Sequence, residues 1–192
     1  MSLTNSTMLP LGTKAIDFSL PATTGRVSLT DFKDNKVLTI AFICNHCPYV
    51  KHILNGFISL AREYQSKGVA FVAINSNDAK AYPEDSFEKM QEIAKKIGFP
   101  FPYLYDELQE VAKKYKAACT PDFYIFDQDR KLVYRGQMDN SRPGNTEAVT
   151  GSDLRTALDA VLADKKVNPE QKPSSGCNIK WKVENAPDYF KP

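Results

Sequence analysis

Four residues that could do chemistry lie within nine positions of one another in the segment FICNHCPYVKH, residues 42–52. They are Cys44, His46, Cys47 and His52. Thiolates and imidazoles are the ligands that zinc and copper prefer, and two cysteines separated by two residues can close a reversible disulfide. A single activated cysteine can also reduce a peroxide. The segment therefore leaves open a metal centre, a peroxide-reducing cysteine and a dithiol that exchanges with other thiols.

The elements around this segment predict where it lies in the fold. Residues 37–43 (VLTIAFI) are continuously apolar and β-branched, as in a strand buried on both faces, and residues 69–75 (VAFVAIN) repeat the pattern. Residues 48–67 have apolar side chains at helical spacing and are followed by Gly68. This is a βαβ unit with Cys44 at the end of its first strand and the start of its helix. Chemistry in such sheets is expected at the carboxyl ends of the strands.

The rest of the chain completes an α/β pattern. We expect one or two short strands in residues 18–32, helices at 85–97, 107–116 and 151–163, a strand at 103–105 and a hairpin with strands 123–126 and 132–135. The fold class predicted is α/β, a mixed central sheet flanked by helices. Residues 1–163 form the domain. Residues 164–192 form an extended C-terminal tail, flexible or packed on the domain through Ile179, Trp181 and Val183.

Composition excludes several classes of partner. Of the 192 residues, 42% are apolar and 25% are charged, and the formal net charge is only +2, so no concentrated basic face for nucleic acid is expected. No apolar run approaches the roughly 20 residues of a membrane span. The first residues lack the basic and apolar regions of a secretory signal. We expect a cytoplasmic protein with no nucleic-acid and no membrane partner.

The position of the cysteine pair favours redox chemistry. A cysteine at a helix N-terminus faces unpaired backbone N–H groups, which stabilise its thiolate, so Cys44 is the expected nucleophile. Cys47 lies on the same side of the first turn and can reach Cys44. His46, when protonated, is expected to lower the pKa of the Cys44 thiol further and to make the pair more oxidising. Pro48 is compatible with this only if the helix starts near Cys47 or bends there.

The two other readings of the segment are less well supported. A zinc site needs two further ligands with their own short spacing, and Cys119 and Cys177 are isolated in the sequence. A copper site would have only His46 and His52 to draw on. The cysteines could also simply fill core space, as buried free cysteine often does. We expect no metal.

Three segments together resemble a known family. They are residues 12–44, the C-N-H-C pair, and TPDFYIFDQDRKLVYRG at 120–136. They resemble thioredoxin-like redoxins of the alkyl hydroperoxide reductase/thiol-specific antioxidant (AhpC/TSA) group, over residues 11–162. The likeness is strongest to uncharacterised bacterial thioredoxin family proteins that carry CNHCP, TPDFYIFD and a C-terminal GC-x-IKWK segment.

The resemblance implies a thioredoxin-like fold and roles for residues outside the pair. Thr120-Pro121 corresponds to the family's cis-proline, opposite the active cysteines, with Thr120 backbone groups free to pair with a substrate strand. Cys119 then lies near the site, as a small apolar filler or as a further redox thiol. Cys177 is a candidate partner for Cys119 or a resolving thiol.

The chain also departs from two branches of that group. The peroxiredoxin branch has a proline seven residues and a threonine three residues before its cysteine, and here these positions hold Val37 and Ala41. Loss of the threonine hydroxyl disfavours peroxide reduction. Ordinary thioredoxins have a tryptophan before the first cysteine and a buried acid six residues before it, and here Ile43 and Leu38 stand there.

We therefore expect a thiol–disulfide oxidoreductase. Cys44 attacks a substrate disulfide, Cys47 resolves the mixed disulfide, and Thr120 and Pro121 present the substrate. The redox centre is the dithiol itself, with no metal or organic cofactor. The partners expected are a protein or small-molecule disulfide and a thiol reductant. The alternatives are an antioxidant peroxide reductase and a binding module that senses redox state through the pair.

Overall fold

The structure is a computed structural model that describes residues 3–190. Two strands without a polar face form its middle. Strands β4 (Val37–Phe42) and β5 (Val69–Asn75) are buried along their whole length and pair in parallel. Successive side chains of a strand point to opposite faces. Val37 and Ala41 accordingly pack into the core on one face of the sheet, and Leu38 and Ile40 into the core on the other. This is why both strands read as continuous apolar runs.

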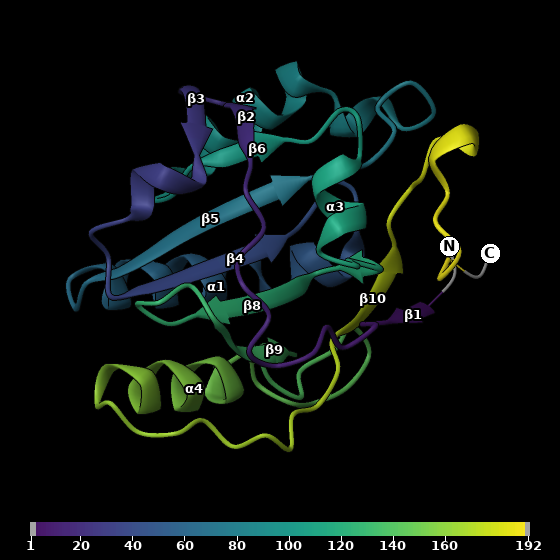
Figure 1. Ribbon diagram of the computed structural model, residues 1–192. Helices are drawn as coiled ribbons and strands as arrows, with labels where there is room; N and C mark the ends of the chain where they lie inside the picture. The colour runs from purple at the N-terminus through teal and green to yellow at the C-terminus, as the bar shows by residue number, and fades with distance from the viewer. Residues whose placement is uncertain (1–2, 191–192) are drawn as a thin grey trace.

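The central sheet is mixed and has seven strands among the described residues (Figure 1). The pairs β4–β5 and β5–β6 are parallel, and the other neighbours are antiparallel. In spatial order the strands are β3 (Gly25–Ser28), β2 (Ser19–Ala22), β6 (Tyr103–Tyr105), β5, β4, β8 (Asp122–Phe126) and β9 (Leu132–Gly136).

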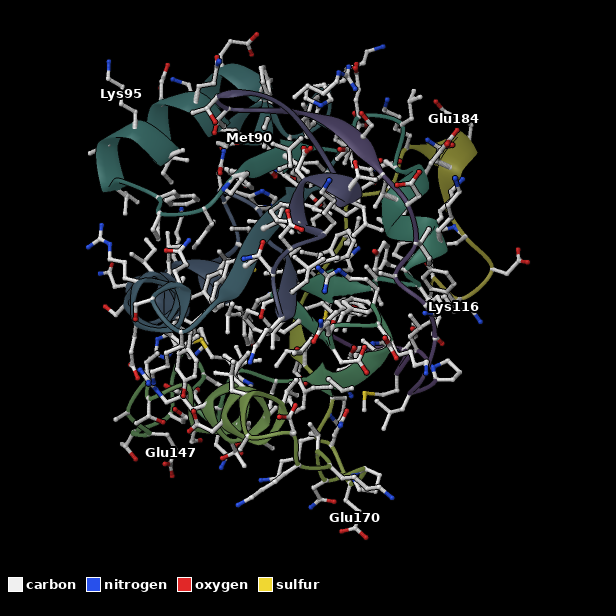
Figure 2. All side chains as sticks on the ribbon, turned by 60° about the vertical axis from the view of Figure 1, so that its left-hand side comes forward. Met90, Lys95, Lys116, Glu147, Glu170 and Glu184 are labelled. Atoms are coloured by element: carbon white, nitrogen blue, oxygen red, sulfur yellow. The ribbon has the colours of Figure 1, made fainter. Side chains whose placement is uncertain are left out.

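Helices cover both faces of this sheet. One core contains side chains of α1, α2 and α4, and the other contains side chains of α3 and the segment that leads into β2. Figure 2 shows Met90 of α2 on the inner side of its helix, whereas the charged side chains of Lys95, Glu147 and Glu170 point outward. The helices are α1 (Pro48–Gln65), α2 (Phe87–Ile97), α3 (Glu110–Lys114) and α4 (Ser152–Leu162), with short 3₁₀ turns η1 (Leu29–Phe32), η2 (Pro83–Asp85) and η3 (Val183–Asn185).

A second, smaller sheet joins the two ends of the chain to the middle of it. Its antiparallel strands are β1 (Leu3–Asn5), β10 (Ser175–Asn178) and β7 (Cys119–Thr120), with β10 between the other two. In Figure 1 the yellow β10 lies between the purple β1 and the end of the central sheet. The tail is therefore paired to the body through its backbone.

The predicted mixed α/β fold is confirmed, with local differences. The helix expected at 107–116 is reduced to α3, because Gln109 before it and Lys116 after it have positive φ angles of 60° and 50°. Ile179 of the tail is buried and Trp181 packs on the same core, as expected. Val183, also expected to dock, is 94% exposed. Among the described residues, no helix is both long and apolar enough to cross a membrane.

The aromatic core under α1 gives a test of the packing. Phe57 is fully buried, and its ring centroid lies 5.1 Å from that of Phe101 and 5.3 Å from that of Phe123. We expect Phe57→Ala to lower the free energy of unfolding by about 3–5 kcal/mol, through lost contacts and the cavity it leaves. Chemical denaturation measures this. Val183→Ala is the matched control and should change stability by less than about 0.5 kcal/mol; equal effects of the two variants would contradict the assigned core.

Candidate active site

The turn between β4 and α1 determines which of the two cysteines lies at the N-terminus of the helix. Helix α1 begins at Pro48, whose missing N–H is tolerated in the first helical position. Cys47 is consequently the N-cap residue, and Cys44 lies before the helix, just beyond the end of β4. The expectation that Cys44 starts the helix is wrong. The backbone N–H groups at the start of α1 act on Cys47 instead.

The Cys47 sulfur is surrounded by donors. The pKa of Cys47 is lowered despite burial, by its interactions with the thiols of Cys177 and Cys44 and with the backbone N–H groups of Val50 and Cys177. In its protonated form Cys47 can donate to the carbonyl oxygen of Thr120, 3.2 Å away. Cys47 is thus the sulfur on which negative charge is best stabilised.

The Cys44 sulfur has the opposite environment. Burial, the hydrogen bond to Cys47 and the negative charge of Asp85 raise the pKa of the Cys44 thiol, and the Thr120 hydroxyl at 3.3 Å opposes them only in part. Sequence analysis expected a lowered pKa at Cys44. Because Pro48 moves the helix start to Cys47, negative charge is favoured on Cys47 rather than on Cys44.

His46 is held by a carboxylate that the sequence did not reveal. Its Nδ1 lies 2.6 Å from Oδ2 of Asp85, and its ring stacks on Tyr82 with centroids 5.2 Å apart. Asp85 is fully buried in η2 and also accepts hydrogen bonds from the Asn45 backbone N–H and the Asn77 side chain, each at 2.7 Å. Sequence analysis placed Asp85 at the start of the helix expected at 85–97, whereas it ends η2 and α2 begins at Phe87, and only the fold brings Asp85 to the cysteines.

Burial opposes ionisation of Asp85, but its hydrogen bonds outweigh burial. The bonds from His46, Asn77 and the backbone of Asn45 hold the pKa of Asp85 below its ordinary value. The negative charge beside Cys44 is therefore maintained. In ordinary thioredoxins a buried acid stands six residues before the first cysteine. Leu38 occupies that position here, and the buried carboxylate near the pair is Asp85, from a different part of the chain.

The same three residues form a set of potential metal ligands. One ligand atom each from Cys44, His46 and Asp85 lie within 4.8 Å of one another. Thiolate, imidazole and carboxylate are all zinc ligands. In the structure the imidazole and the carboxylate hydrogen-bond to each other. Sequence analysis did not foresee this grouping because Asp85 was not recognised.

Thr120 and Pro121 lie against the pair, as the resemblance implied. Their peptide bond is cis, and Thr120 contacts both cysteines through its hydroxyl and its carbonyl. The backbone of Thr120 was expected to be free for a substrate strand. Instead, it pairs with Cys177 of β10, so the chain's own tail occupies that edge.

The other two cysteines lie in different surroundings, and all four are free thiols. Cys177 is buried in the same cluster as Cys44 and Cys47 and pairs with Thr120, which contacts both. The Cys119 sulfur lies near the carbonyl oxygens of Pro121 and Ser174, at 3.6 and 3.9 Å, and burial raises its pKa. The structure thus brings Cys177 to the pair rather than to Cys119. Redox roles for either stay predictions.

The fold and this site together define a class, the thioredoxin-like redoxins. Residues 11–135 match the AhpC/TSA family, and the chain belongs to that family. A search of curated proteins gives no match.

Among solved structures, the chain is similar to an uncharacterized conserved protein from Geobacillus kaustophilus. The identity is 57% and the TM-score 0.93, over 95% of this chain and 98% of that one. A hypothetical protein from Sinorhizobium meliloti 1021 is 51% identical, with a TM-score of 0.92, over 94% and 99% of the two chains. The thioredoxin domain of a thiol-disulfide oxidoreductase from Bacteroides vulgatus shares the fold at 15% identity, with a TM-score of 0.61 and coverage of 79% and 99%.

Asp85→Asn tests the buried carboxylate through the pH dependence of stability. Because the pKa of Asp85 is lowered on folding, its contribution is present above its unfolded pKa of about 3.9 and is lost as pH falls through the folded value. We expect the variant to lose about 1–3 kcal/mol at neutral pH, since an amide cannot accept all three donors. The difference from wild type should shrink below about pH 4.

Denaturant unfolding across this pH range makes the measurement. Asp34→Asn changes an exposed carboxylate and is the matched control, expected to leave the pH profile unaltered. A constant difference between Asp85→Asn and wild type at all pH values would contradict a role for the charge.

Proposed function

We propose that this protein is a thiol–disulfide oxidoreductase that works through the Cys44–Cys47 dithiol. The observation that carries the proposal is a pair of buried thiols held against the cis Thr120–Pro121 segment, with the Cys44 sulfur 3.3 Å from the Thr120 hydroxyl and the Cys47 sulfur 3.2 Å from the Thr120 carbonyl oxygen. Membership of the AhpC/TSA family supports an oxidoreductase role. The substrate is a protein or small-molecule disulfide, and a thiol reductant returns the pair to the dithiol. The proposal requires no metal or organic cofactor.

Cys44 makes the first attack in this proposal. Its proton passes to the Cys47 thiolate, to which it is already hydrogen-bonded. The Cys44 thiolate then attacks one sulfur of the substrate disulfide, forming a mixed disulfide and releasing one substrate thiolate. Cys47 gives its proton to that leaving thiolate and attacks the Cys44 sulfur. The second substrate thiol leaves, and the protein is left with a Cys44–Cys47 disulfide.

The His46–Asp85 pair tunes the charge on these thiols. Asp85 raises the pKa of Cys44, and a protonated His46 offsets that charge. His46 therefore makes the anionic dithiol more favourable and the pair more oxidising. The same contact keeps the imidazole beside Cys44, with its Nε2 atom buried.

Trapping tests the order of attack. Cys47→Ser cannot resolve the mixed disulfide, so incubation with insulin should leave insulin bound to Cys44, visible on non-reducing gels and lost with dithiothreitol. Insulin reduction by dithiothreitol should be accelerated by wild type and should fall close to the uncatalysed rate in Cys44→Ser and Cys47→Ser.

Three results would change the proposal. Trapping in Cys44→Ser but not in Cys47→Ser would make Cys47 the nucleophile. Rapid consumption of hydrogen peroxide with an empty trap would favour peroxide reduction. Reversible oxidation of the pair with no turnover of insulin would favour a redox-sensing binding module.

His46→Ala tests the tuning role separately. Without the imidazole, the Asp85 charge is uncompensated, and we expect the apparent pKa of the dithiol to rise and its alkylation by iodoacetamide near neutral pH to slow several-fold. His52→Ala is the control, because His52 bonds to Ser141 rather than to Asp85. An unchanged alkylation profile in His46→Ala, at wild-type stability, would remove His46 from this role.

A further inference from the structure

The tail crosses the dithiol as a β-strand. In β10, Cys177 pairs with Thr120 and Asn178 pairs with Cys119. On its other side β10 pairs with β1, with Cys177 opposite Leu3. The strand is therefore held by backbone pairing on both edges. An extended segment added to a free strand edge is a common way in which proteins bind peptides, and here the peptide belongs to the same chain.

Gly176 allows the close approach of this strand. A Cβ atom at this position would lie 2.1 Å from the carbonyl oxygen of Thr120 and 3.2 Å from Cδ of Pro121. No side chain fits at 2.1 Å from a backbone oxygen, so glycine is required here. Glycine at position 176 therefore lets β10 approach the Thr120–Pro121 segment beside the cysteines.

Lys180 anchors the tail beyond β10. Its backbone N–H donates to Asn77, and its carbonyl accepts from the Asp78 N–H and the Gln109 side chain, at distances of 2.8–2.9 Å. Its ammonium group bonds to Asn178. These bonds join the tail to the loops after β5 and β6. The position of Cys177 is thus fixed from both directions.

Cys177 brings a third sulfur to the redox pair. Cys177 is 3% exposed and pairs with Thr120, whose hydroxyl and carbonyl contact Cys44 and Cys47. Cys44 and Cys47 are themselves only 2% and 0% exposed. All three cysteines belong to one buried cluster, with the pair on the turn before α1 and Cys177 on β10.

We propose that Cys177 is a third redox thiol, which exchanges with the Cys44–Cys47 disulfide to form Cys47–Cys177, so that β10 acts as an intramolecular substrate strand. The Cys177 thiolate attacks the Cys47 sulfur, the Cys44–Cys47 bond breaks, and Cys44 leaves as the thiolate. One S–S bond forms and one breaks, so no further oxidant is consumed. The oxidant is the substrate disulfide that first produced Cys44–Cys47, and in this respect the inference rests on the proposed function.

The charges around the sulfurs suit this exchange. In the reduced protein, the hydrogen bond to Cys47, burial and the Cys47 charge raise the pKa of Cys177, so Cys177 remains a thiol. Once Cys47 is part of a disulfide, it carries no charge, whereas Lys180 still favours the Cys177 thiolate. Cys177 is thus inactive until the pair is oxidised. The product ties the tail over the site and leaves Cys44 free.

Disulfide mapping of the full-length protein tests this proposal. After oxidation with diamide, free thiols are blocked with N-ethylmaleimide and the protein is digested with trypsin without reduction. Cys44 and Cys47 fall in peptide 37–51, and Cys177 falls in peptide 167–180. We expect a species that joins these two peptides and carries the N-ethylmaleimide label on Cys44.

Variants assign the bond within that species. The joined species should persist in Cys119→Ser, the control, and should be lost in Cys44→Ser, because that variant cannot form the Cys44–Cys47 disulfide that Cys177 attacks. It should disappear in Cys47→Ser. In Cys177→Ser the Cys44–Cys47 disulfide should accumulate.

Gly176→Val tests the strand rather than the thiol. The added side chain should displace β10, reduce the joined species several-fold and speed alkylation of Cys44 and Cys47. Ser175→Ala, the neighbouring change in the same strand, should leave both near wild type. Circular dichroism confirms that each variant is folded.

The outcomes separate this inference from the proposed function. If the Cys44–Cys47 disulfide forms and insulin is reduced, but peptides 37–51 and 167–180 never join, the inference is overturned and the proposed function stands. If oxidation joins neither Cys44 to Cys47 nor Cys47 to Cys177, and no variant reduces insulin, both are overturned.

Discussion

The position of the Cys47 sulfur at the first turn of α1 is the constraint on which the site depends. Backbone N–H groups at that turn stabilise negative charge, and the thiols of Cys44 and Cys177 add to this. Cys44 then keeps its proton, and Cys177 keeps its own. Of the three sulfurs, Cys47 is therefore the one on which negative charge is best stabilised. Asp85 and the Thr120 hydroxyl then act in opposite directions on the pKa of Cys44.

Much of the fold could be predicted because its pattern is local. The apolar runs of β4 and β5 need no partner to be recognised, since strands buried on both faces are apolar throughout. The position of Cys44 at a strand end followed directly. The division of roles between the cysteines did not, because it depends on whether the helix starts before or at Pro48. A shift of three residues moved the helix N-terminus from one thiol to the other.

The missed parts of the site are set by contacts distant in sequence. Asp85 reaches His46 across 39 residues, from a short 3₁₀ turn where the sequence predicted the first residue of a helix. Gly176 looks like any glycine in a polar tail, and the need for it appears only when the Thr120 carbonyl is placed against it. The C-x-x-C motif thus predicts thiol chemistry, whereas the pKa values of the cysteines and the strand that covers them depend on the folded chain.

The small sheet has a consequence for the N-terminal strand. Leu3–Asn5 pairs with β10, and Ser6 next to it donates to the buried Asp122 at 2.7 Å and bonds through its N–H to the Ser174 carbonyl. The first described strand, the tail and the Thr120 segment thus share one hydrogen-bonded ladder. Loosening β10 at the cysteines removes the partner of β1. Amide exchange at residues 3–5 therefore reports, from a part of the chain with no chemistry of its own, whether the dithiol is covered.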